Sequence, residues 1–64
     1  MKKVYMVIGY SLLTGKQDII DYVEAENETE AYKKYEQNNP ECEANEILME
    51  FEKEEFEEYM KEVE

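Results

Sequence analysis

Residues 4–10 are apolar on both sides of an extended chain, and this pattern restricts the possible fold more than any other feature of the sequence. One side carries Val4, Met6 and Ile8, and the other carries Tyr5 and Val7. Side chains alternate between the two faces of a sheet, so a strand that is apolar on both sides is normally covered above and below. The segment is therefore predicted to be the central strand of a sheet.

A second strand is expected after a turn at residues 14–16, where Gly15 can adopt a positive φ. Residues 18–25 are rich in β-branched and aromatic side chains, and their acidic interruptions suit an edge strand. A helix then begins at Asn27, which approximates a capping box with Glu30 three residues later. The sequence Asn-Asn-Pro at residues 38–40 ends this helix.

A third strand is predicted over residues 45–52, after a polar loop that contains Cys42. Simple alternation places Ile47, Met49 and Phe51 on one side, and Glu46, Glu50 and Glu52 on the other with Leu48 among them. This alternation is typical of a strand with one side in water.

The final helix is amphipathic and strongly anionic, because residues 41–64 hold eleven of the eighteen acidic residues and two lysines. At about 100° per residue, one stripe carries Phe56, Tyr59, Met60 and Val63, and the remaining arc carries Glu54, Glu55, Glu57, Glu58 and Glu62. An isolated helix of about a dozen residues is marginal in water. The stripe is therefore expected to pack on the sheet or on a second subunit.

Together these elements predict one α+β domain over residues 1–64, with the element order β-β-α-β-α. The helix between the second and third strands should be a right-handed crossover, which makes those strands parallel and gives a three-stranded sheet of order 2-1-3. The predicted core consists of Val4, Met6, Val7, Ile8, Ile20, Val23, Ala31, Tyr35, Ile47, Met49 and Phe51.

No group of residues indicates catalysis, a cofactor or a metal site. The chain has no histidine, and acidic neighbours on both sides of Cys42 disfavour a reactive thiolate. Two glycines are too few for a phosphate-binding loop, and the glutamates match no calcium-loop pattern. We therefore expect a non-enzymatic protein that carries neither cofactor nor metal.

Charge and cysteine content narrow the compartment and the partner. A single cysteine suits a reducing compartment, and the apolar run 4–13 is too short to span a bilayer and lacks a cleavage motif. We expect a location in the cytoplasm. A net charge of −11 opposes binding to nucleic acid or anionic membranes and favours basic surfaces on other proteins.

The predicted partner-binding residues are the acids of the third strand and final helix. They are Glu46, Glu50, Glu52, Glu54, Glu55, Glu57, Glu58 and Glu62. Their expected separations, ~7 Å along a strand and ~5–6 Å on a helix, resemble phosphate spacing on a coarse scale and would allow DNA mimicry. The same charge could instead serve solubility alone.

The stretch 22–32, Tyr-Val-Glu-Ala-Glu-Asn-Glu-Thr-Glu-Ala-Tyr, resembles the strand-to-helix junction of small acidic phage and plasmid proteins of the DpnD/PcfM group. Glu24-Ala25-Glu26 and Glu30-Ala31 match in kind, and Glu46-Ile47-Leu48 corresponds to the group's final strand. The asparagine-rich helix stop and the terminal helix depart from the group. The resemblance implies an accessory protein of a mobile element in the cytoplasm of a bacterial host, and it carries over no functional residue.

The leading hypothesis is a phage or mobile-element protein, monomeric or homodimeric, that binds and inhibits a host defence or nucleic-acid-handling protein through its acidic surface. The alternative is a structural or assembly protein that homo-oligomerises through a sheet edge or through the final helix.

Overall fold

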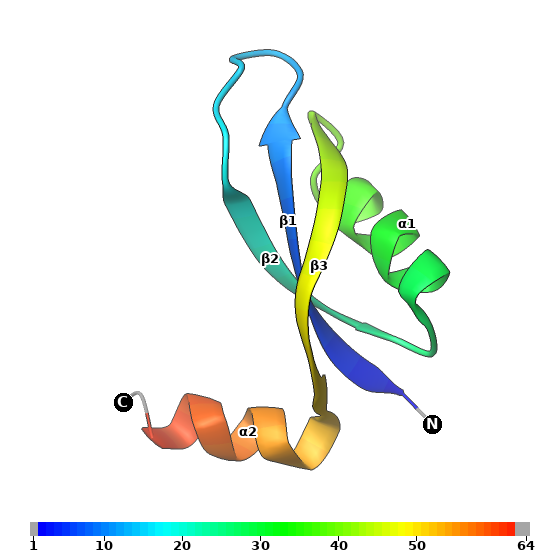
Figure 1. Ribbon diagram of the computed structural model, residues 1–64, viewed down its shortest axis with the longest axis vertical. Helices are drawn as coiled ribbons and strands as arrows, with labels where there is room; N and C mark the ends of the chain where they lie inside the picture. Colours follow the sequence, from blue (N-terminus) through cyan, green and yellow to red (C-terminus); the bar gives the residue numbers. More distant parts are fainter. Residues whose placement is uncertain (1, 63–64) are drawn as a thin grey trace.

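The computed structural model describes residues 2–62 and shows an α+β fold with the element order β-β-α-β-α (Figure 1). Its elements are β1 (Lys3–Ser11), β2 (Ile19–Ala25), α1 (Glu28–Asn38), β3 (Cys42–Glu52) and α2 (Lys53–Glu62). The strands form a sheet of order β2-β1-β3, in which β1 pairs antiparallel with both neighbours. β2 and β3 therefore run in the same direction. The predicted fold class, strand order and central position of β1 are confirmed.

α1 covers one face of the sheet and forms the core with it. The Asn27 side-chain oxygen accepts a hydrogen bond from the Glu30 N–H at 2.8 Å, which begins the helix as predicted. The helix ends where the Asn39 N–H donates to the Tyr35 carbonyl at 2.9 Å. The core between α1 and the sheet consists of Tyr5, Val7, Val23, Ala25, Ala31 and Tyr35, each at most 3% exposed.

Tyr35 lies directly against Gly9 at the centre of this core. A Cβ atom at Gly9 would lie 2.6 Å from the Tyr35 hydroxyl and would collide with the Glu43 carbonyl. The Tyr35 hydroxyl donates to the Ile19 carbonyl at 2.7 Å, so the ring also holds the start of β2. Burial raises the pKa of Tyr35, because the charged phenolate would lose its hydration there.

β3 does not alternate as simply as predicted, because its register with β1 shifts at Leu48. Ile47 pairs with Val7 and packs against the core under α1, whereas Met49 and Phe51 lie on the opposite face of the sheet. The prediction that these three apolar residues share one side is wrong. A β-bulge adds one residue to the strand, and one added residue reverses the alternation beyond it.

A second register shift at Asn45 reverses the alternation again. Between the two shifts, Glu46 pairs with Ile8 and lies on the face away from α1. β3 also begins earlier than predicted, at Cys42, so this half-buried cysteine belongs to the strand and not to a loop.

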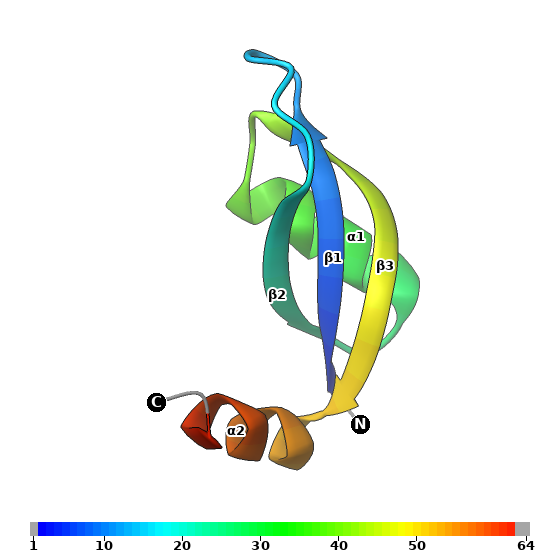
Figure 2. The same ribbon diagram turned by 60° about the vertical axis from the view of Figure 1, so that its left-hand side comes forward.

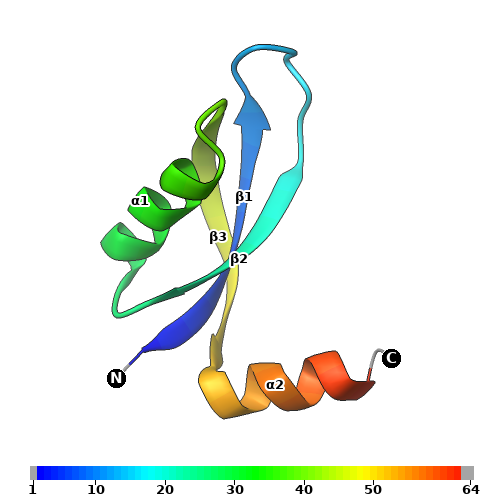
Figure 3. The same ribbon diagram turned by 180° about the vertical axis from the view of Figure 1, so that it is seen from behind.

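α2 begins at Lys53, directly after β3 ends at Glu52, with no loop between them. Figures 1 and 3 show α2 leaving the end of β3 on the side opposite α1 and running across the strands. The turned view in Figure 2 shows the same helix at the end of the sheet, well below the level of α1. A helix that folds back along a sheet normally needs a connecting loop of a few residues. α2 therefore covers only one end of the second face.

Candidate protein-binding face

The sheet face opposite α1, called the open face below, is apolar and uncovered except near α2, where Val4 is 5% exposed. It consists of Val4, Met6 and Ile8 of β1, Ile20 and Tyr22 of β2, and Met49 and Phe51 of β3. Ile20 is 44% exposed, Tyr22 37% and Met49 54%. No element between residues 2 and 62 lies over the middle of this face.

The predicted core was therefore too large. Ile20 and Met49 were expected inside but are exposed, and Met6, Ile8 and Phe51 are only half-buried. The predicted core took residues from both faces of the sheet, but α2 covers only one end of the second face. The sequence does hold one sign of this, because residues 50–54 contain no glycine, proline or asparagine that would let the chain turn back.

α2 closes one end of the open face through aromatic contacts. The ring centroid of Phe56 lies 5.1 Å from that of Tyr22 and 5.8 Å from that of Phe51. Tyr59 stacks on Phe51 at 6.0 Å, yet Tyr59 is 48% exposed and Met60 44%. The apolar stripe of α2 thus continues the open face around a corner, and Val63, its predicted fourth member, lies outside the described residues.

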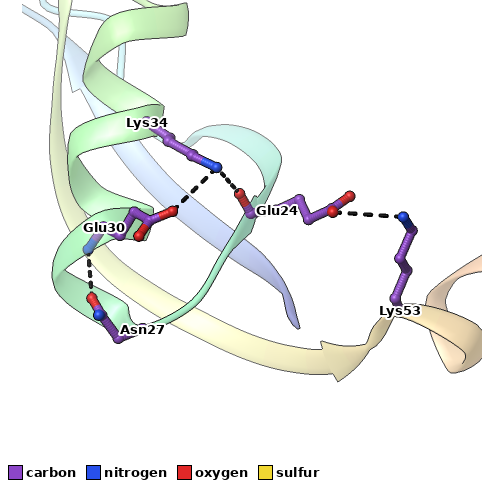
Figure 4. Close-up of polar contacts among 5 residues, drawn as sticks. All are labelled: Glu24, Asn27, Glu30, Lys34 and Lys53. Carbon is purple, nitrogen blue, oxygen red and sulfur yellow. Dashed lines mark hydrogen bonds and ion pairs between the residues drawn. The ribbon is translucent and has the colours of Figure 1, made fainter. Parts of the chain in front are cut away.

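Polar contacts hold the start of α2 at this corner (Figure 4). The Lys53 ammonium lies 3.6 Å from the Glu24 carboxylate at the end of β2. The Glu24 carbonyl in turn accepts a hydrogen bond from Lys34 of α1 at 2.6 Å, and Lys34 also pairs with Glu30 at 3.3 Å. A small open hollow of about 260 Å³ lies beside this contact, and Val4, Tyr22 and Phe56 are among its lining residues.

The structure separates the acids that were predicted to act together. Glu50 and Glu52 lie on the α1 side of the sheet, and each carboxylate is 3.8 Å from the Lys3 ammonium. Glu46 lies on the open face, and Glu62 is the last residue of α2. The remaining four are exposed on α2, namely Glu54, Glu55, Glu57 and Glu58.

Only some of these acids border the open face. At about 100° per residue, Glu55 and Glu57 flank the apolar stripe of α2 on its two sides, whereas Glu54 and Glu58 lie on the far side of the helix. Of the two flanking acids, Glu57 lines the hollow beside Val4 and Tyr22. Glu43 borders the other end of the face, where it accepts a hydrogen bond from the Tyr10 hydroxyl at 2.8 Å. This hydrogen bond and the negative charge of Glu43 raise the pKa of Tyr10. Glu43, Glu46 and Glu57 are called the acidic rim below.

The described part of the chain offers a surface for contact. Between residues 2 and 62, no three cysteine or acidic side chains come together in a way that could hold a metal ion. Over the same residues, no helix has the length and apolar character needed to cross a membrane.

Comparisons with known proteins give no match to a protein-family model, to a curated protein or to a solved structure. The open face and the acidic rim are therefore the features that indicate a function.

Proposed function

We propose that this protein is a non-enzymatic protein-binding module. The observation that carries the proposal is the exposed apolar surface formed by the open face and α2, bordered by carboxylates. Small proteins rarely expose a contiguous apolar patch with a polar border unless it contacts another molecule. The net charge of −11 favours a partner with a basic surface, because long-range attraction accelerates encounter.

The proposal extends to a source and an effect. The resemblance of residues 22–32 to the DpnD/PcfM group supports a protein of a phage or plasmid that acts in the host cytoplasm. We propose that it blocks a host defence or nucleic-acid-handling protein. Glu54 and Glu58, on the outer side of α2, would present negative charge to a site that normally receives phosphate. In the structure, residues 22–32 form the end of β2 and the start of α1, so the resemblance supports the source and not the site.

The test uses two charge-matched variants of the full chain. A partner is first captured from bacterial lysate on the immobilised protein and purified, and its binding kinetics are then measured at several salt concentrations. E46Q/E57Q removes two charges at the open face, and E26Q/E41Q removes two exposed charges elsewhere. We expect E46Q/E57Q to slow association more than it speeds dissociation and to reduce the salt dependence, because rim charges act mainly on encounter. Equal effects of the two variants, or no captured partner, would contradict the proposal.

The alternative function, assembly by self-association, draws on the exposed Tyr59 and Met60 of α2. Pairing through the free edge of β3 is disfavoured, since bulges at Leu48 and Asn45 make this edge irregular. Sedimentation velocity over a range of protein concentrations separates the two functions. A stable oligomer at micromolar concentration that dissociates in the Met60→Ser variant would support assembly.

A further inference from the structure

The open face has the dimensions of a site for one α-helix. Neighbouring strands lie about 4.8 Å apart, so roughly 10 Å separate the outer strands of this sheet, close to the diameter of a helix. α1 fills the opposite face in this way, with Ala31 and Tyr35 fully buried against the strands. The same sheet thus has one face occupied by a helix and a second face of equal width without one among the described elements.

α2 limits the length of anything bound along the strands. It crosses one end of the open face, where Phe56 contacts Tyr22 and Phe51. Phe56 contacts Tyr22, the fourth of the seven residues of β2, so only residues 19–22 lie beyond α2, a length of roughly 13 Å at ~3.3 Å per residue. A helix rises ~1.5 Å per residue, so about nine residues of a bound helix would lie on the open face before meeting Phe56 and Met60.

The charge around the open face selects between possible occupants. Carboxylates of the acidic rim border it at Glu43, Glu46 and Glu57. Two lysines lie nearby: Lys53 is paired with Glu24, and Lys61 lies beside Glu57 and Met60. Lysine or arginine residues flanking an apolar stripe would meet these carboxylates. A second copy of this chain would instead bring a further net charge of −11 against the first.

From these three observations we infer that the open face and α2 bind a basic amphipathic helix of the partner protein, an inference that rests on the proposed function. Ile20, Tyr22 and Met49 form the floor under the apolar stripe of that helix. Phe56 and Met60 form the wall at its end, and the acidic rim pairs with the basic residues on its flanks.

The test uses a synthetic 15-residue peptide with a leucine stripe and lysine flanks, measured by fluorescence anisotropy with the full chain. A scrambled peptide of the same composition keeps the charge but loses the stripe. We expect it to bind at least about tenfold more weakly, since burial of the apolar face provides most of the helix-in-groove affinity. Equal binding of both peptides would show nonspecific attraction to an acidic protein and would overturn the inference.

Two double variants of the protein locate the site. I20T/M49S makes the open face more polar, and L12S/L13S makes the same kind of change at the start of the β1–β2 loop, where Leu12 is 62% exposed and Leu13 74%. We expect I20T/M49S to weaken peptide binding by about tenfold or more, because two apolar side chains that the bound peptide would cover are lost. L12S/L13S should leave peptide binding unchanged. Equal losses would overturn the inference.

Two further outcomes separate this inference from the proposed function. If the wild-type chain self-associates and I20T/M49S restores the monomer, a second copy occupies the face and the inference is wrong. If no helical peptide binds while the captured partner still depends on Glu46 and Glu57, the inference fails and the proposed function stands.

Discussion

The two faces of this sheet have similar residue types, yet only one of them became a core. Under α1, Tyr5 and Val7 are at most 3% exposed, whereas Ile20 and Met49 on the open face remain about half exposed. The difference lies in the connections. Residues 26–27 and 39–41 give the chain room to pass α1 back across the first face, while β3 enters α2 without a loop. Chain connectivity, and not hydrophobicity alone, decides which apolar face is covered.

The largest difference between the faces is expected for loss of a side chain from each. Tyr35→Ala should lower the free energy of unfolding by about 3–5 kcal/mol, because it leaves a cavity at the centre of the core under α1. A domain this small has only about that much stability, so the variant should be unfolded. Met49→Ala on the open face should cost less than about 1 kcal/mol, in proportion to the little area it buries. Urea unfolding measures both, and similar losses would show that the open face is part of the core.

A second prediction concerns a substitution that adds a methyl group to the sheet face under α1. Gly9→Ala should cost about 1–3 kcal/mol by overpacking, because the new Cβ meets a backbone carbonyl that cannot move aside easily. Gly15→Ala is the control: the loop there has open space, but its φ of 74° strains an alanine by about 1 kcal/mol. The thermal unfolding midpoint of Gly9→Ala should be lower than that of Gly15→Ala. The reverse order would mean that Tyr35 does not lie against Gly9.

The contacts between the open face and α2 should contribute less to the free energy of unfolding than the core under α1. Phe56→Ala is expected to cost about 1–2 kcal/mol through its contacts with Tyr22 and Phe51. Met60→Ala should cost less than about 0.5 kcal/mol, since Met60 is exposed and most surface changes are of this size. Truncation after Lys53 should lower the free energy of unfolding by about as much as Phe56→Ala does, and should leave a folded chain. A truncated chain that unfolds would place α2 in the core.

On the α1 side of the sheet, the Tyr35 hydroxyl alone should make a small contribution to stability that depends on pH. Tyr35→Phe should cost about 1 kcal/mol at pH 7, the usual net value of one hydrogen bond. The pKa of Tyr35 is raised in the folded state, so the unfolded chain ionises first, near pH ~10. Its contribution to stability is therefore complete below that pH and is lost as the pH rises further.

Thermal midpoints of wild type and variant measured at pH 8 and at pH 11 check this sign. The wild type should lose more stability than Tyr35→Phe between the two values. Tyr10→Phe is the control, because Tyr10 is partly exposed and its charge would be screened by water. A larger change in the Tyr10 variant would show that the Tyr35 hydroxyl is not the buried group.

Sequence analysis correctly predicted the features that depend on local patterns of apolar, polar and capping residues. The two-sided apolarity of residues 4–8 indicated the central strand, and Asn27 with Glu30 indicated where α1 begins. The bulge at Leu48 has no such mark, because it results from Ile47 packing under α1 while Met49 pairs with Met6. The eight acids were expected to act as one surface, but the shift at Leu48 leaves Glu46 on the open face and puts Glu50 and Glu52 on the α1 side, while the other five lie on α2.

The direct joint between Glu52 and Lys53 has a consequence for how the gene can vary. An inserted residue there would turn the whole of α2 by about 100° about its axis and would carry Phe56 away from Tyr22. The β1–β2 loop, by contrast, lies at the far end of the hairpin from α2 (Figure 1), and its Leu13 is exposed. Insertion of one alanine at either point, followed by the NMR signals of the Tyr22 ring, would check the contrast. We expect natural variants of this chain to differ in length at the loop and to keep the joint unchanged.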